Sequence, residues 1–440
     1  MFPRSRLASR IAHRSGILEL MEDLGSALAS GSSDVVMMGG GNPARIPDVE
    51  AIWARILTGL TEDPVALGPL LGNYDPPAGN PGFRADLAQF LNRSCGWEIG
   101  PENIAVTPGG QTAFFYLLNL FGGRGAGEDQ PTRKILLPLA PEYIGYADQG
   151  LEPDFFVACP GKIKKTRPHR FKYHIDFDQL RITPEIGAIC LSRPTNPSGN
   201  VVTRGELERL ASLASAHGIP LLLDNAYGLP FPGVVYTNAE PFWHPNVIQT
   251  LSLSKLGLPG TRTGFVVGPP DVIREIAALN AVVGLANNNL GQFIARSLLQ
   301  SGELETLCRN FIRPFYQHRC LEALALIDRE LDGLPYRVHE PEGAFFLWLW
   351  LEDCPLTSRE LYLGLKERGV IVVPGNYFFY GMPGESPHQR QCLRLSYTQP
   401  PEVLAKGIGI LGAWLRTLHA ARPRRKRQRS AGSGESDSAD

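Results

Sequence analysis

Residues 252–262, SLSKLGLPGTR, hold the side chains best suited to covalent chemistry. Lys255 follows an apolar run and precedes two glycines and a proline, which places it on a tight loop with little helical propensity. Ser252, Ser254 and Arg262 place hydroxyls and a cation around it. Such a group could bind a dianionic phosphate while the lysine amine attacks an aldehyde. A surface lysine on a turn would explain the same stretch, and the stretch alone does not separate the two interpretations.

Two further polar side chains stand near the ends of apolar runs. Asn196 lies between two prolines in RPTNPSG (193–199) and could donate a hydrogen bond to a ring oxygen. Asp224 closes the apolar run PLLLD (220–224), where a carboxylate is costly unless it is paired. A protonated pyridine nitrogen would be a suitable partner, because that pairing makes the ring an electron sink. An ordinary strand-to-helix loop and a helix-capping aspartate are the simpler alternatives.

A glycine-rich segment, VTPGGQTA (106–113), follows one apolar run and opens another of helical character. Free backbone N–H groups at a helix N-terminus attract phosphate, so this loop is a candidate phosphate site. By itself a glycine-rich loop is weak evidence.

The composition of the 440 residues is that of a soluble globular protein, with 43% hydrophobic and 20% charged residues and a formal net charge of −1. No global field favours nucleic acid or an anionic membrane, so we expect neither as a partner. The seven cysteines contain no C-x-x-C pair and the nine histidines no H-E-x-x-H, so we expect neither a disulfide framework nor a metal site. No apolar run reaches the roughly 18 residues that span a bilayer, and no secretory signal is evident. The sequence therefore predicts a cytoplasmic protein.

Short apolar runs in the middle of the chain predict strands buried on both faces, as in a mainly parallel sheet flanked by helices. Between the second and third run, Thr203 is the predicted N-cap of a helix and Glu206 completes a capping box. A strand, a helix and a strand in this order form a β-α-β unit, which makes the fold class α/β. The predicted strands lie at 134–139, 188–192, 220–224, 247–252 and 264–268.

From about Glu303 the pattern changes to a long helix followed by short strands and helices, which predicts a smaller α+β domain. Its strands are expected at 336–339, 344–351, 370–373 and 392–397, and its helices at 357–368 and 400–419. We therefore divide the chain into an N-terminal arm and lid segment (1–45), a large domain (46–302), a small domain with part of the N-terminal segment (303–420), and a tail (421–440).

The tail turns from basic to acidic and has almost nothing apolar, so we expect it to be disordered. Contact with nucleic acid is the weaker alternative for its basic half.

Taken together, these motifs resemble the fold-type I, class I family of pyridoxal-phosphate aminotransferases. The phosphate loop, P-T-N-P-S-G, D-x-x-Y, S-x-S-K and P-G-x-R follow the family's order and intervals. The resemblance covers nearly the whole chain, up to about Arg416, and favours the chemical interpretation of each motif over its simpler alternative. It implies the fold-type I architecture, with a large domain around a mainly parallel sheet and a smaller α+β domain.

The resemblance also implies pyridoxal phosphate as the cofactor, bound to Lys255 as a Schiff base (the internal aldimine), with the same lysine acting as proton carrier. Asp224 would pair with the pyridine nitrogen, and Asn196 and Tyr227 would bind the ring hydroxyl oxygen. Tyr143, in APEY (140–143), matches the aromatic residue that stacks on the ring, although a core aromatic would fit the same pattern. The remaining cofactor contacts would come from Gly110, Gln111, Ser252, Ser254 and Arg262.

The same resemblance assigns the substrate contacts and a partner. Arg394, in CLRLS (392–396), matches the arginine that grips the substrate α-carboxylate, and its alternation with two leucines directs it away from their face. Gly40 and Asn196 would complete the substrate site. Tyr74, in NYDPPAG (73–79), matches the tyrosine that reaches the phosphate of the partner subunit, which implies a homodimer with shared active sites.

Longer segments resemble a narrower family, the bacterial valine–pyruvate aminotransferases. That resemblance implies transfer of the amino group of L-valine, or a similar small apolar amino acid, to pyruvate, giving 3-methyl-2-oxobutanoate and L-alanine. The lack of an evident second arginine for a distal carboxylate favours the same substrates. Two features depart from the family: NNN at 287–289, where a Pro/Gly-rich turn is expected, and the basic tail. The matching segments are RSGI (14–17), MEDL (21–24), GGGNPA (39–44), PLAPEYIGY (138–146), DNAYG (224–228), SLSKLGLPG (252–260) and PEGA (341–344).

Two alternatives keep the cofactor and change the reaction: a broad-specificity aromatic or aminoadipate aminotransferase, and a carbon–sulfur lyase. A regulatory protein that only binds pyridoxal phosphate is less favoured. The roughly 35 residues before Gly39 are too few for a helix-turn-helix module.

Overall fold

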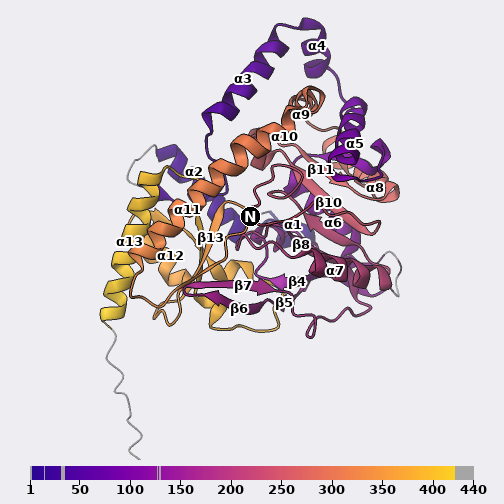
Figure 1. Ribbon diagram of the computed structural model, residues 1–440. Coiled ribbons are helices and arrows are strands. Elements are labelled where there is room, and N and C mark those ends of the chain that lie inside the picture. Colours follow the sequence, from indigo (N-terminus) through magenta and orange to yellow (C-terminus); the bar gives the residue numbers. More distant parts are fainter. Residues whose placement is uncertain (1, 14, 31–34, 126, 128–129, 422–440) are drawn as a thin grey trace, which may run out of the picture.

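The computed structural model describes residues 2–13, 15–30, 35–125, 127 and 130–421 (Figure 1). Apart from residue 421, the predicted disordered tail lies outside the described residues. Two sheets with helices packed around them account for most of the described chain. None of the described helices combines the length and the apolar character needed to cross a membrane.

The first sheet has eight strands, and its centre is parallel. Strands β5, β4, β8, β9 and β10 run parallel to one another, and each of the predicted runs is a strand. The strands in spatial order are β2 (Ile104–Thr107), β11 (Gly264–Val267), β10 (Val247–Ser252), β9 (Leu221–Asp224), β8 (Ile186–Ser192), β4 (Thr132–Ala140) and β3 (Gly123–Arg124), with β5 (Phe156–Pro160) also beside β4.

The run at 264–268 forms β11, which pairs antiparallel with β10 and makes the sheet mixed. A parallel neighbour would need a long crossover, whereas β10 and β11 are joined only by the short loop that carries Lys255. The sheet thereby ends in β11 and β2, which are antiparallel to each other as well.

Helices cover both faces of this sheet, which is why its strands are apolar throughout. On β11, Val266 packs in the core cluster of α6 (Gly110–Phe121), α7 (Arg204–Ala216) and α8 (Pro270–Gly284). Its neighbour Phe265 packs on the other side, with α5 (Pro81–Cys95) and α9 (Asn289–Ser301). Each face is therefore closed to water, and only the strand ends are open to a ligand.

The second sheet is built mostly from the C-terminal part of the chain. Strands β6 and β7 precede β8 in the chain, so the chain enters the second sheet before it completes the first. The predicted division at residues 45, 302 and 420 stays a prediction. The order is β15 (Val373–Pro374), β16 (Cys392–Ser396), β13 (Phe346–Trp350), β12 (Arg337–His339), β7 (Arg170–His174) and β6 (Lys162–Arg167).

Three helices pack around the second sheet, and a short strand ties the N-terminal segment to it. The predicted helices at 357–368 and 400–419 are α12 (Ser358–Glu367) and α13 (Pro401–Ala420). The predicted long helix from Glu303 is α10 (Glu303–Leu307) and α11 (Arg313–Glu330), joined by a wider turn over Cys308–Ile312 next to a proline that cannot donate a backbone hydrogen bond. β1 (Val36–Met37) pairs with β14 (Val370–Ile371).

The helix between β8 and β9 begins with the predicted capping box. Thr203 Oγ1 accepts a hydrogen bond from Glu206 N, and the Thr203 backbone N–H donates to the Glu206 carboxylate at 2.9 Å. Glu206 also accepts a hydrogen bond from Ile175 N, so the cap joins α7 to the residues that follow β7.

Thr203→Ala should lower the free energy of unfolding by about 1 kcal/mol, because it leaves a backbone donor of α7 without its acceptor. The measurement is the thermal midpoint of the purified protein. Ser212→Ala is the matched control, since Ser212 is exposed on the same helix and bonds only the Glu208 carbonyl. Equal midpoints for the two variants would contradict the prediction.

Candidate active site

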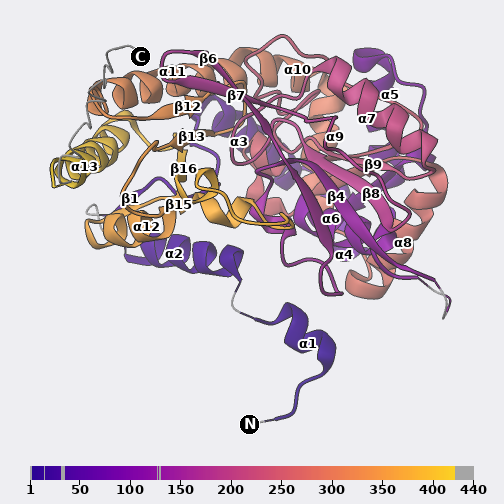
Figure 2. The same cartoon turned by 90° about the horizontal axis from the view of Figure 1, so that it is seen from below.

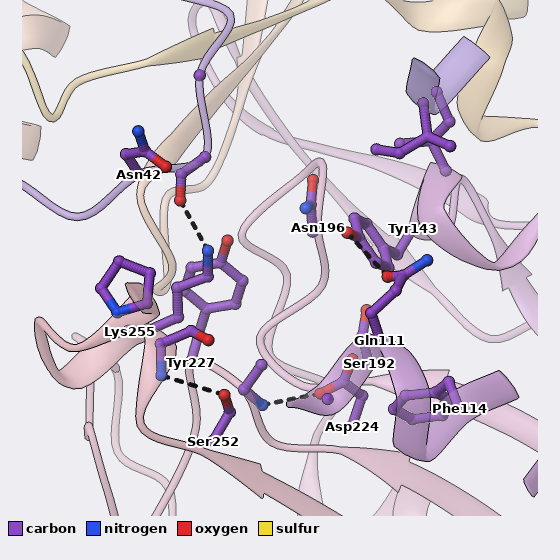
Figure 3. Close-up of a pocket in the computed structure, with 18 of the residues that line it drawn as sticks. Asn42, Gln111, Phe114, Tyr143, Ser192, Asn196, Asp224, Tyr227, Ser252 and Lys255 are labelled. Carbon is purple, nitrogen blue, oxygen red and sulfur yellow. Dashed lines mark hydrogen bonds between the residues drawn. The ribbon is translucent and has the colours of Figure 1, made fainter. Parts of the chain in front are cut away.

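A cavity of about 580 Å³ opens at the carboxyl ends of the parallel strands (Figure 3). Parallel strands end at the same edge of a sheet, so residues far apart in the sequence meet there. Ser192, Asp224 and Ser252 are the last residues of β8, β9 and β10, and all three line the cavity. The other predicted site residues in the lining are Gly40, Gly110, Gln111, Tyr143, Asn196, Tyr227, Ser254, Lys255, Arg262 and Arg394.

Lys255 lies in a short helical turn directly after β10 and extends into the cavity. Its Nζ donates a hydrogen bond to the Gly41 carbonyl at 2.7 Å and lies 5.3 Å from the centre of the Tyr227 ring. Burial lowers the pKa of this amine to about 8; Arg394 lowers it further, whereas Asp224 opposes the shift. About a tenth of the amine is therefore uncharged and nucleophilic at pH 7, far more than for an ordinary lysine.

Asp224 lies behind the lysine at the end of β9. Its carboxylate accepts hydrogen bonds from the Tyr146 hydroxyl, from Ala226 N at 2.8 Å and from Thr250 Oγ1 at 3.3 Å. Burial raises the pKa of Asp224, and these hydrogen bonds oppose the rise. Because all three donors are neutral, a cationic ligand group would still find an unmatched carboxylate here.

Another group of lining residues offers donors for a phosphate. Gly110 and Gln111 form the first turn of α6, and an added Cβ at Gly110 would meet only open space. Arg262 adopts a left-handed backbone with φ of 47° and donates from Nη1 to the Pro259 carbonyl at 3.1 Å. Ser252 Oγ accepts from Ser254 N at 3.1 Å, which leaves its hydroxyl hydrogen for another acceptor. Helix N–H groups, a hydroxyl and a guanidinium together suit a dianion.

Arg394 supplies a cation to the cavity lining from the second sheet. It is buried on β16, where its Nη1 donates to Asn196 Oδ1 at 2.8 Å and its Nη2 to the Gly39 carbonyl at 2.6 Å. Its Nε is buried without a hydrogen-bond partner among the described residues, and burial lowers its pKa to about 10. A guanidinium has five N–H donors and two of them are used in these hydrogen bonds, so the side chain keeps donors for an anion. The contact between Arg394 and Asn196 joins the two sheets and was not predicted.

Part of the cavity wall comes from the segment predicted as an N-terminal arm and lid, although none of the residues concerned was predicted as a site residue. Ile17, Leu20 and Met21, on α2 (Gly16–Ser30), line the cavity together with Ile144. Their spacing of three and four residues marks one helix face, which was a usable signal. Figure 2 shows α2 lying along α12. Ion pairs hold it there, from Glu19 to Arg359 at 2.9 Å and from Asp23 to Lys366 at 2.7 Å.

Other residues of the site were likewise missed. Tyr146 and Glu142 lie within the matched segment 138–146, but nothing in their spacing indicated the hydrogen bonds to Asp224 and Ser192. Both contacts join residues that are far apart in the sequence.

Tyr74 does not reach the cavity of its own chain. It is 80% exposed, in the loop after α4 (Pro64–Gly72), which projects from the body with α3 (Pro47–Thr61) (Figure 1). The segment 287–289, where the sequence departs from the family pattern, contacts this loop, because Asn289 Nδ2 donates to the Asn73 carbonyl at 3.0 Å. The described residues contain no cluster of three His, Cys, Asp or Glu side chains that could hold a metal ion.

The donor set fits one kind of ligand: a protonatable ring nitrogen at Asp224, a phosphate at α6 and Arg262, and a carbonyl carbon within reach of the Lys255 amine. Such a site in an α/β fold of this topology defines a pyridoxal-phosphate enzyme of fold type I. The chain belongs to the family described as aminotransferase class I and II, whose model matches residues 43–411. The predicted family, fold class and pyridoxal-phosphate cofactor are thereby confirmed.

Similar proteins cover nearly the full length of the chain. The valine–pyruvate aminotransferase of Escherichia coli K12 is 46% identical over 407 residues, which span 92% of this chain and 96% of that protein. The crystal structure of valine–pyruvate aminotransferase from Salmonella typhimurium LT2 gives a TM-score of 0.85 at 44% identity, covering 92% of this chain and all of that one. A structure from Psychrobacter arcticum 273-4, assigned to the amino-acid aminotransferases, gives 0.92 at 40% identity and covers 96% and 100%.

In the cofactor-free protein, carbamylation of Lys255 by cyanate should follow a titration with a midpoint near pH 8, because only the uncharged amine reacts. Peptide mass spectrometry over a pH series measures it. Arg394→Gln should move the midpoint upward, since it removes a neighbouring positive charge. A wild-type midpoint near 10.5, the ordinary lysine value, would show that the cavity does not perturb this amine.

Proposed function

We propose that this aminotransferase moves the amino group of L-valine, or a similar small apolar amino acid, to pyruvate, giving 3-methyl-2-oxobutanoate and L-alanine. The observation that carries the proposal is the combination of one arginine for the substrate carboxylate, Arg394, with the apolar wall of Ile17, Leu20, Met21 and Ile144 in the same cavity lining. The 46% identity to the valine–pyruvate aminotransferase of Escherichia coli supports the same substrates.

Pyridoxal phosphate supplies a carbon that combines with amines and a pyridine ring that withdraws electrons from the attached group. We assign its covalent attachment to Lys255 and its ring nitrogen to Asp224. Tyr143 would stack on the ring, and Asn196 and Tyr227 would bind the ring oxygen. Gly110, Gln111, Ser252, Ser254 and Arg262 would hold the phosphate.

The Lys255 amine is also suited to move the proton at the substrate Cα. A pKa of about 8 lets it take up and release a proton near neutral pH without a large free-energy cost. Its hydrogen bond to the Gly41 carbonyl holds Nζ next to the backbone of Gly40, which would close on the substrate. Asp224 would take no part in this proton transfer and would pair with the ring nitrogen.

Arg394 would bind the substrate carboxylate, with Asn196 fixing the guanidinium plane. The one other arginine in the lining, Arg262, is assigned to the phosphate. A second carboxylate on the substrate would therefore face the apolar side chains of α2 with no cation to pair it, and its burial would be costly. Small apolar side chains meet no such cost.

We further propose a homodimer in which Tyr74 reaches the phosphate site of the partner subunit. Large apolar side chains are exposed around it, Val65 at 82%, Leu71 at 73% and Val282 at 85%, which is unusual for a surface that stays in water. The side-chain oxygens of Asn280, Asn287 and Asn289 are buried without a hydrogen-bond partner within the described chain. An interface with a second copy would cover the apolar groups and could satisfy these acceptors.

The cytoplasm is the location that we propose. Cys95, Cys159, Cys190, Cys308, Cys320 and Cys392 are free thiols in the structure, which fits a reducing compartment.

The purified protein, loaded with pyridoxal phosphate, should form alanine from pyruvate fastest with L-valine and comparably small apolar donors. A screen of amino donors against pyruvate and other 2-oxo acids, read by chromatography, measures this. Aspartate and glutamate should be at least about tenfold slower in kcat/KM, as expected for a carboxylate without a partner. Efficient turnover of these two donors with none of valine would overturn the proposal. Lys255→Ala is the control, which should lose both the visible absorbance of the bound cofactor and turnover.

Hybrid dimers test the shared site. Lys255→Ala and Tyr74→Ala should each be strongly impaired alone, whereas a hybrid carries one site with both lesions and one intact site. Random mixing of dissociated subunits should therefore restore about a quarter of the wild-type activity. If mixing restores nothing while gel filtration and subunit tags show that hybrids formed, Tyr74 does not act across the interface.

A further inference from the structure

Glu142 is a fully buried carboxylate immediately before Tyr143. Oε1 accepts hydrogen bonds from Tyr143 N at 2.7 Å and from Ser192 Oγ at 2.5 Å, and Oε2 accepts one from Ser192 N at 2.9 Å. Its own backbone N–H donates to the Phe378 carbonyl at 2.9 Å. The side chain therefore lies behind the cavity wall and does not line the cavity.

These contacts join the loop that carries Tyr143 to the end of β8, beyond the pairing of β4 with β8 in the sheet. Tyr143 is on the loop after β4, and its carbonyl accepts a further hydrogen bond from the Tyr380 hydroxyl at 2.9 Å. Ser192 ends β8 and is in register with Asp224 on β9. Glu142 thus contributes to the position of Tyr143 relative to Asp224, together with Tyr146, which donates to Asp224 and to the Tyr143 carbonyl.

The electrostatic surroundings of Glu142 contain no compensating cation among the groups that influence it. The titratable groups facing it are Asp224 on β9, Cys190 on β8, Tyr146 and Tyr380. Burial raises the pKa of Glu142 to about 7, hydrogen bonds from Ser192 and Tyr143 oppose the rise, and Asp224 adds to it. Burial without a cation makes the anionic form of this carboxylate costly. The backbone N–H groups of Ser192 and Tyr143 can only donate, and the hydrogen bonds that they donate to the carboxylate favour its anionic form.

We propose that Glu142 is a positioning residue of the transamination site, which holds Tyr143 and the end of β8 in place and adds a second negative charge behind the cofactor ring. The inference rests on the proposed function, because it takes the ring to occupy the space between Tyr143 and Asp224. A protonated ring is the cation that the pair of carboxylates lacks. Both carboxylates would then stabilise positive charge on a cofactor ring held in this space.

Glu142→Gln tests this with little change in volume. In the enzyme loaded with pyridoxal phosphate, the pH at which the visible absorbance of the lysine-bound cofactor changes should fall by about one unit, because a nearby negative charge is lost. The kcat for valine should fall about tenfold, the factor equivalent to one such unit, while KM changes less than about twofold. Glu340→Gln is the charge-matched control; Glu340 lies outside the cavity lining, paired with Arg167, and its variant should leave the transition unmoved.

Ser192→Ala provides a second variant in case Glu142→Gln folds poorly. It removes one donor to the carboxylate and should shift the same transition downward by a smaller amount. In the double variant the shift should equal that of Glu142→Gln alone, because Ser192 acts through Glu142.

The outcomes separate the inference from the function on which it rests. A wild-type protein that shows no visible absorbance with pyridoxal phosphate would overturn the proposed function. If the wild-type protein shows the absorbance and both variants change absorbance at the same pH as the wild type, only the role of Glu142 is overturned. A lowered thermal midpoint in Glu142→Gln with an unmoved transition would assign the residue a purely structural role and would also overturn the inference.

Discussion

Lys255, Asp224 and Arg394 share one cavity, where burial disfavours the charged form of each. The pKa of Lys255 falls to about 8, that of Arg394 to about 10, and that of Asp224 rises. Partly compensated buried charges cost several kcal/mol apiece, and here hydrogen bonds from neutral groups offset only part of that cost. A ligand with a cationic group for Asp224, a carboxylate for Arg394 and a carbonyl carbon that combines with the Lys255 amine would satisfy all three. The charges of the cavity therefore suit the binding of a cofactor and an amino acid together.

The fold holds these groups in place through rigid strands rather than through the loops alone. Asp224 is in register with Ser192 on one side and with Thr250 on the other, so its position is fixed by two neighbouring strands. Arg394 comes from the other sheet and meets the first at Asn196. The loop that carries Asn196 is in turn anchored to the second sheet, because Lys172 on β7 donates to Asn200 Oδ1 at 2.9 Å. The site thus depends on the two sheets remaining docked.

Much of this arrangement could be predicted from the sequence, because it is encoded locally. Apolar runs gave the strands, the Thr203–Glu206 spacing gave a helix start, and residues at strand ends gave the cavity lining. The antiparallel direction of β11 was missed because apolar composition does not report strand direction. The contacts of Tyr146 with Asp224 and of Arg394 with Asn196 were missed because they join distant parts of the chain, whose approach depends on packing. The assignment of Tyr74 to a partner's site remains a prediction, since a single chain cannot display it.

The proposed substrate preference depends on the lack of a cation beside the apolar side chains of α2 as much as on the presence of Arg394. Two acidic residues of α2, Glu19 and Asp23, are paired with Arg359 and Lys366 of α12, whereas Leu20 and Met21 line the cavity. One helix thereby offers an apolar face to the ligand and a charged face to the second sheet's helices. A polar substrate side chain would lose its water against that apolar face and gain no partner, whereas valine loses only unfavourable contact with water. The same ion pairs that hold α2 over the cavity therefore also determine which side of the helix the substrate meets.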